Sequence, residues 1–138
     1  MQSAGYILNA GSEQFIQDCV HKLQQDHAAS LLIFPEGTRT AKGEQLNDFQ
    51  RGAANIALRA GVPIRPVLIS CTPSTLTKNE KWYHIPEQPF HIHVKVLDAI
   101  RVEDVLDDVT VNPKNVRQLN QQLQWFFNQE LSLNEQSC

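Results

Sequence analysis

The chain has 138 residues, of which 41% are hydrophobic and 20% are charged, a balance typical of a single globular domain over residues 1–138 and unlike disordered, collagen-like or coiled-coil chains. Twelve basic and fifteen acidic residues give a formal charge of -3, which excludes a strong positive field, so no nucleic-acid partner is expected. Three scattered cysteines without a Cys-x-x-Cys pair predict neither a disulfide framework nor a zinc site, and they favour a reducing cytoplasm.

The first third of the chain predicts a strand, a helix and a second strand. Residues 6–8 form a short apolar run that ends in a turn. Ser12 is a suitable N-cap for a helix that extends to about Gln25, because apolar side chains recur there at helical spacing. The continuous apolar run 31–34 ends at Pro35 and predicts a strand buried on both faces of a parallel sheet.

A second helix is expected in the middle of the chain. Residues 36–48 are polar and contain glycine, so they predict an exposed connection. Asn47 or Asp48 is expected to cap the helix that follows, and Gly61 is expected to end it.

The second half predicts two strands and a long helix. Residues 62–70 form a strand whose prolines remove ladder donors, so full pairing is expected only from about Val67. Residues 91–96 alternate polar and apolar side chains, which predicts a half-buried strand near a sheet edge. Asn112 followed by Pro113 predicts the start of the C-terminal helix.

This order of elements predicts an α/β fold. We expect a partial α/β sandwich with a mostly parallel sheet, right-handed crossovers, an additional edge strand and a C-terminal helix. No apolar stretch approaches the length of a membrane span. A sheet of this kind with an uncovered edge and face predicts exposed apolar surface and self-association.

The segment FPEGTR, residues 34–39, follows the apolar run directly and has residue types that suit a phosphate. Gly37 allows close backbone approach, Thr38 adds a hydroxyl donor, and Arg39 offers a planar fork that matches two phosphate oxygens. Glu36 can orient Arg39 or accept a hydrogen bond from a hydroxyl. From residue types alone, an ordinary turn with solvated charges is an equally open interpretation.

This segment resembles the third signature block of the glycerolipid acyltransferases, notably the 1-acyl-sn-glycerol-3-phosphate acyltransferases. FQRGA at residues 49–53 and VPIRPV at residues 62–67 resemble the segments that follow in that family, in the same order and at a similar spacing. The resemblance extends from residue 6 to residue 70, roughly half of the chain.

The resemblance implies acyl transfer from acyl-CoA or acyl carrier protein, as donor substrate, to a hydroxyl of a lysophospholipid or a related phosphate-bearing acceptor. It implies no cofactor and no metal. By position, the acceptor and its phosphate would be bound by Glu36, Gly37, Thr38 and Arg39. Arg51 and Pro63 would shape the site, with Arg51 supplying the charge of a family lysine that Gln50 replaces.

The family's catalytic His-x4-Asp pair lies upstream of its third block, so the resemblance places it before residue 1. The chain is therefore interpreted as the C-terminal portion of an acyltransferase domain, inactive alone. The full-length protein is expected at the cytosolic face of a membrane, with peripheral membrane contact. His21 and Asp26 have the same spacing, but five helical steps separate them by about 140°, so His21 is interpreted as a helix-surface residue.

Two differences from the family leave the acceptor open. Residues 5–11 resemble the start of the second block but lack its arginine, and Gln50 replaces the usual lysine. Two alternative functions remain: a non-catalytic phosphate- or lipid-binding module of the same fold, and an α/β protein that binds nucleotides or sugar phosphates through Gly37 and Arg39.

His91 and His93 share one face of a predicted strand. No third ligand lies at a recognised metal-site spacing, so we expect both imidazoles to be exposed to solvent rather than bound to a metal.

Overall fold

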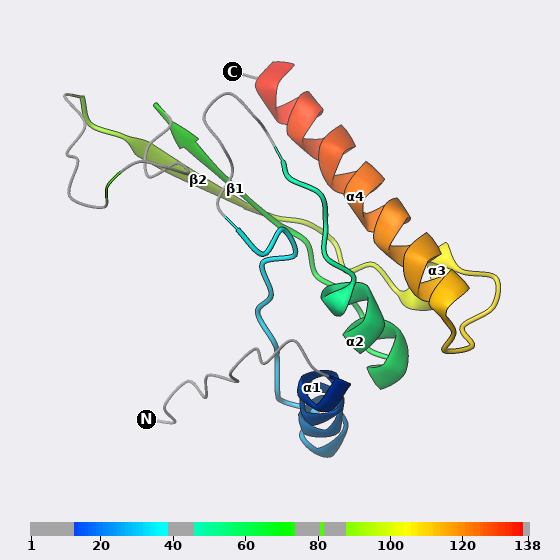
Figure 1. Ribbon diagram of the computed structural model, residues 1–138. Coiled ribbons are helices and arrows are strands. Elements are labelled where there is room, and N and C mark those ends of the chain that lie inside the picture. The colour runs from blue at the N-terminus through cyan, green and yellow to red at the C-terminus, as the bar shows by residue number, and fades with distance from the viewer. Residues whose placement is uncertain (1–12, 39–45, 74–80, 82–87, 137–138) are drawn as a thin grey trace.

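The computed structural model describes residues 13–38, 46–73, 81 and 88–136 (Figure 1). The described elements are, in chain order, α1 (Glu13–Gln25), α2 (Gly52–Ala60), β1 (Val67–Thr72), β2 (His91–Val96), α3 (Val102–Val105) and α4 (Pro113–Gln136). The prediction of a mixed α/β chain is confirmed. The strand expected at residues 6–8 lies outside the described residues.

The sheet of the described chain has two strands, and they are antiparallel. Val67 pairs with Val96 at one end of the ladder and Thr72 with His91 at the other, which confirms a strand in each predicted region and the start of regular pairing at Val67. The prediction that strand 91–96 is half-buried is wrong, because all six of its residues are exposed. The prediction of a mostly parallel sheet is wrong for this part of the chain. A parallel ladder needs a third strand beside β1, and the described residues contain none.

The largest difference from the predicted fold concerns residues 31–34. They belong to no strand or helix, and the side chains of Leu32 and Phe34 are 77% and 69% exposed. The prediction of a strand buried on both faces is therefore wrong here. An apolar run is compatible with burial, but burial also requires neighbouring strands and helices, and those contacts are not specified by the run itself.

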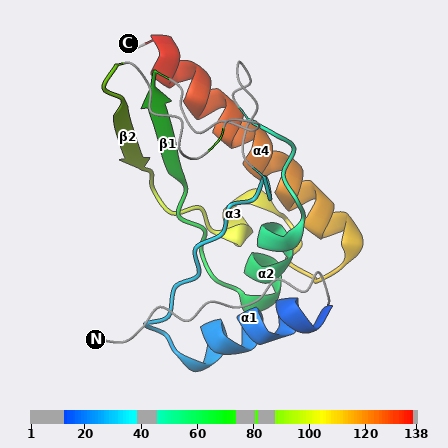
Figure 2. The ribbon, with the colours of Figure 1, turned by 60° about the vertical axis from the view of Figure 1, so that its left-hand side comes forward.

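One face of the sheet is turned toward α4. Lys95 is the ladder partner of Leu68, so the two side chains share a face. Leu68 is 3% exposed, and Nζ of Lys95 lies 3.3 Å from Oε2 of Glu130 in α4. Figures 1 and 2 show α4 running from the sheet toward α2.

The N-terminal end of α2 differs from the prediction. The helix begins at Gly52, and Arg51 occupies the cap position without a side-chain capping hydrogen bond. Neither Asn47 nor Asp48 acts as the cap, because both side chains bind distant partners: Asn47 donates to Glu36, and Asp48 accepts from Gln124.

The C-terminal end of α2 and the N-terminal end of α4 are as the local sequence predicted. Gly61 adopts φ +65° after the last turn of α2 and donates its N–H to the carbonyl of Ala57 at 2.9 Å, as predicted for a C-terminal glycine. Asn112 caps α4, since its Oδ1 accepts the N–H of Asn115 at 2.8 Å.

The core lies where α2, α3 and α4 meet. It consists of the side chains of Phe49, Ala54, Ala57, Leu58, Val102, Leu106, Val116, Leu119 and Leu123. Ala54 of α2 and Leu119 of α4 are both 0% exposed, so the small side chains of α2 permit close approach to α4. α1 packs against α2 at the end of the molecule away from the sheet (Figure 2). Burial there raises the pKa of the Cys19 thiol, which is 1% exposed.

Candidate functional site

The predicted phosphate segment forms a tight turn. The N–H of Gly37 donates to the carbonyl of Phe34 at 3.1 Å, and Gly37 adopts φ +67°. This conformation is strained for residues with a Cβ atom. The backbone therefore favours a glycine at this position, whereas close approach of Gly37 to a ligand stays a prediction.

Glu36 closes the loop that follows the turn. Its Oε2 accepts the backbone N–H of Asn47 at 2.8 Å and the side-chain amide of Asn47 at 3.0 Å. The pair thus joins the two ends of segment 39–45. Arg39 belongs to this segment and lies outside the described residues, so its phosphate contact stays a prediction.

The polypeptide at residues 46–50 lies directly beside the turn. The N–H of Gln50 donates to the carbonyl of Pro35 at 2.7 Å. A Cβ atom built on Gly37 would lie 3.4 Å from Cγ of Gln50. Gln50, which stands where the family resemblance expects a lysine, is therefore adjacent to Gly37.

The other described residues of the predicted site are Thr38, Arg51 and Pro63. Thr38 is exposed at the end of the described turn, and Arg51 is exposed directly before α2. Pro63 is exposed beyond the other end of this nine-residue helix, which rises about 13 Å. The structure thus brings Glu36, Gly37 and Thr38 together and places Pro63 across α2 from Arg51.

Asn47 is a site residue that the sequence did not predict as such. The Asn-Asp pair before an apolar helix was interpreted as a cap, which is the commonest role of these residues. The local pattern contains no signal for the contact with Glu36, because the partner lies 11 residues earlier in the chain.

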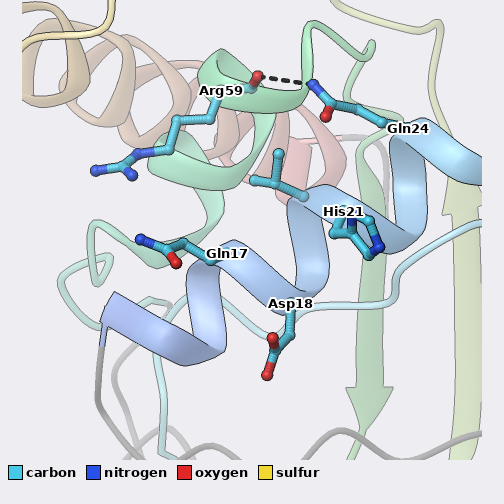
Figure 3. Close-up of a pocket in the computed structure, with 6 residues that line it drawn as sticks. Gln17, Asp18, His21, Gln24 and Arg59 are labelled. Carbon is cyan, nitrogen blue, oxygen red and sulfur yellow. Dashed lines mark hydrogen bonds between the residues drawn. The ribbon is translucent and has the colours of Figure 1, made fainter.

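His21 lies away from this turn, as expected for a helix-surface residue. It is exposed on α1 and lines an open depression of about 360 Å³ between α1 and α2 (Figure 3). The other lining residues are Gln17, Asp18, Val20, Gln24 and Arg59. Asp26 instead accepts the N–H of Ala28 at 2.9 Å in the turn after α1, so its carboxylate does not orient His21.

His91 and His93 are both exposed in β2, as the sequence predicted. Among the described residues no cluster of His, Cys, Asp or Glu side chains has an arrangement that could hold a metal ion. Within the same part of the chain, no helix combines the length and apolar character needed to cross a membrane.

Comparison with known proteins identifies the first half of the chain. A family model described as "Acyltransferase" matches residues 8–70. The 1-acyl-sn-glycerol-3-phosphate acyltransferase alpha of Mus musculus is 36% identical over 86 residues, which are 62% of this chain and 29% of the mouse protein. The enzyme of that name from Escherichia coli strain K12 is 46% identical over 50 residues, which are 36% of this chain and 20% of the bacterial protein.

A third relative, the 1-acyl-sn-glycerol-3-phosphate acyltransferase of Cocos nucifera, is 37% identical over 75 residues, 54% of this chain and 23% of the coconut protein. The chain thus matches less than a third of the length of each of these relatives. No solved structure matches it significantly. The family match contains α1, the turn at Gly37, α2 and most of β1, so residues 8–70 of this chain are similar to the acyltransferase family.

Proposed function

We propose that this chain forms the acceptor-binding part of an O-acyltransferase that acts on lysophosphatidic acid, 1-acyl-sn-glycerol 3-phosphate. The donor would be acyl-CoA or acyl carrier protein, and the reaction would take place at the cytosolic face of a membrane. The family match over residues 8–70 carries the proposal, since it includes the turn and its relatives are named for this acceptor.

The geometry of the turn supports the binding of a phosphate. Thr38 is exposed, so its hydroxyl can reach a ligand, and Arg39 follows it directly. A guanidinium group can bind two phosphate oxygens through parallel hydrogen bonds. We assign Glu36 to closure of the loop rather than to the phosphate, because Asn47 donates two hydrogen bonds to its carboxylate.

In the transfer itself, the acceptor hydroxyl attacks the thioester carbonyl, its proton passes to a general base, and the thiol of the donor leaves. The role proposed for this chain is to bind and orient the acceptor. His21 and Asp26, which have the spacing of the family's catalytic pair, are not arranged as one, because Asp26 accepts the N–H of Ala28. We therefore expect no turnover from the 138-residue chain alone. Turnover with acyl-CoA that His21→Ala abolishes would contradict this expectation.

The proposal is tested by titrating the chain with 1-hexanoyl-sn-glycerol 3-phosphate. The NMR chemical shift of the Gly37 amide reports the binding. Arg39→Ala should weaken binding by about 2 kcal/mol, roughly 30-fold, because a charged hydrogen-bond partner of the phosphate is lost. Arg39→Lys should restore only part of the affinity, since an ammonium group cannot reproduce the fork. The exposed Arg117 of α4 provides the control variant Arg117→Ala, which should bind normally.

Two outcomes would overturn the proposal. Equal affinity of the wild type and Arg39→Ala would show that the turn does not bind the phosphate. Tighter binding of a nucleotide or a sugar phosphate than of the lysophosphatidate would favour a different class of ligand at the same turn. 1-Hexanoylglycerol, which lacks the phosphate, is the ligand control.

A further inference from the structure

Helix α4 lies outside the family match and contacts the segment beside the turn. The N–H of Phe49 donates to Oε1 of Gln124 at 3.1 Å, and Nδ2 of Asn120 donates to the carbonyl of Phe49 at 3.0 Å. Nε2 of Gln124 also donates to Oδ1 of Asp48 at 3.2 Å. Asn120 and Gln124 are four residues apart, so both side chains lie on one face of the helix.

These contacts satisfy a backbone that has been withdrawn from water. Phe49 is 7% exposed, and its ring packs against Phe127 of α4 with centroids 5.3 Å apart and nearly perpendicular planes. A buried backbone N–H or carbonyl without a partner is costly. The two amides of α4 therefore fix both backbone polar groups of Phe49.

The same stretch of chain supports the turn on its other side. Gln50, the residue after Phe49, donates its N–H to the carbonyl of Pro35 at 2.7 Å. Asn47, two residues before Phe49, donates to Glu36. Residues 47–50 thus lie between α4 and the turn, with hydrogen bonds to both.

We propose that Asn120 and Gln124 are positioning residues for the acceptor-binding turn. By fixing the backbone of Phe49, they determine where Gln50 meets Pro35 and where Asn47 meets Glu36. The consequence for a ligand rests on the proposed function, whereas the consequence for the turn itself does not.

The first experiment measures amide hydrogen exchange in the 138-residue chain. In Asn120→Ala and Gln124→Ala, exchange of the Gln50 and Gly37 amides should rise about fivefold or more, which corresponds to the loss of one net hydrogen bond. Amides of α1 should keep their rates. Gln121 and Gln122 are exposed on the same helix, so Gln121→Ala and Gln122→Ala are matched controls that should leave every rate unchanged.

Two results would overturn the inference. One is unchanged exchange at Gln50 and Gly37. The other is a uniform rise at all amides, because a purely structural role lowers global stability without selecting the turn.

Milder variants keep the test decisive if the alanine variants do not fold. In an Asp48→Asn background, which avoids two neighbouring carboxylates, Gln124→Glu retains an oxygen acceptor for the N–H of Phe49. We therefore expect Gln124→Glu to protect the Phe49 amide better than Gln124→Ala does in the same background. Asn120→Asp removes the donor to the carbonyl of Phe49. Asn120→Asp should accelerate exchange at Gln50, and normal exchange in this variant would contradict the inference.

The second experiment measures affinity for 1-hexanoyl-sn-glycerol 3-phosphate. The Asn120→Ala/Gln124→Ala double variant should bind at least about fivefold more weakly than Gln121→Ala/Gln122→Ala. Absence of binding by the wild type would refute the proposed function, and the exchange data would still decide the positioning role. Normal affinity of a double variant whose turn exchanges faster would show that ligand binding does not depend on this positioning.

Discussion

The carboxylate of Glu36 accepts both the backbone N–H and the side-chain amide of Asn47, at 2.8 and 3.0 Å. These residues stand on either side of segment 39–45, so the contact closes the loop that contains Arg39. Glu36 thus has a structural role in the turn, whereas its neighbours Thr38 and Arg39 are the residues proposed to bind an anion.

The strength of this closure can be measured with two substitutions at Asn47. Asn47→Ala removes the side-chain donor and should lower the free energy of unfolding by about 1 kcal/mol. Asn47→Asp places a second carboxylate beside Glu36 and should cost more, because like charges repel. Urea unfolding gives both values. Asn128→Ala, at an exposed position of α4, should stay within about 0.5 kcal/mol of the wild type; an equally small effect at Asn47 would show that the closure does not stabilise the fold.

The backbone of Gly37 gives a second prediction, with Gly61 as its control. Both glycines have positive φ, +67° and +65°, so alanine at either position should cost about 1 kcal/mol of stability. Only Gly37 lies in the turn, and only there does an added Cβ meet a neighbour within 4 Å, Cγ of Gln50. Gly37→Ala should therefore weaken binding of the lysophosphatidate, and Gly61→Ala should not. Equal binding by both variants in a titration would exclude a role for the turn.

Elements with local signals were predictable from the sequence. The cap at Asn112, the C-terminal glycine Gly61 and the start of pairing at Val67 each depend on residues that are close in sequence. The structure of residues 31–34 was not predictable in this way, because burial of an apolar run depends on neighbouring strands that are distant in the sequence. The four-residue helix α3 was not predicted either, since so short a helix has no periodic pattern.

In the candidate site, too, local features were predictable from the sequence and long-range contacts were not. The need for glycine at position 37 follows from the tight turn, which the sequence indicated. The contacts that surround the turn were not predictable, because Asn120 and Gln124 lie 71 and 75 residues from Phe49. In a long helix rich in amides, these two side chains are indistinguishable by sequence from exposed ones such as Gln121 and Gln122.

The sheet face opposite α4 is apolar and exposed, as the sequence predicted for an uncovered face. Its exposed apolar side chains are those of Val67, Ile69, Ile92, Val94 and Val96. Ile69 and Val94 are ladder partners and are 57% and 61% exposed. Such a surface is expected to bind hydrophobic dyes and to promote self-association.

The double variant Ile69→Thr/Val94→Thr tests this surface. It should reduce dye fluorescence and the mass measured by light scattering, with a change in stability of no more than about 1 kcal/mol, because both side chains are already exposed. Leu68 is the neighbour of Ile69 in β1 but lies on the opposite face and is 3% exposed, so Leu68→Ala should cost about 2–4 kcal/mol. A wild-type chain that is monomeric at high micromolar concentration and does not bind the dye would contradict the prediction.

The loop before α4 should make stability depend on acid pH. The pKa of Asp108 is lowered first by the hydroxyl of Thr110 and then by its backbone N–H, which donates to Oδ1 at 2.9 Å. Burial opposes these two effects and raises the pKa, whereas the side chains of Asn115 and Lys114 lower the pKa by smaller amounts. These groups therefore favour the ionised carboxylate in the folded state.

The sign of the pH effect follows from this depressed pKa. Above the ordinary aspartate pKa of about 3.9 the ionised carboxylate contributes its full stability, and the contribution is lost as the pH falls through the lower folded-state pKa. Thr110→Val removes the hydroxyl donor, so the pKa of Asp108 should rise toward its ordinary value and the loss of stability should begin at a higher pH. Thr110→Ser keeps a hydroxyl and should titrate like the wild type. Carboxyl-carbon NMR gives the pKa of Asp108 directly, and urea unfolding across the same pH range gives the stability; identical titration curves for Thr110→Val and Thr110→Ser would show that the hydroxyl does not control this carboxylate.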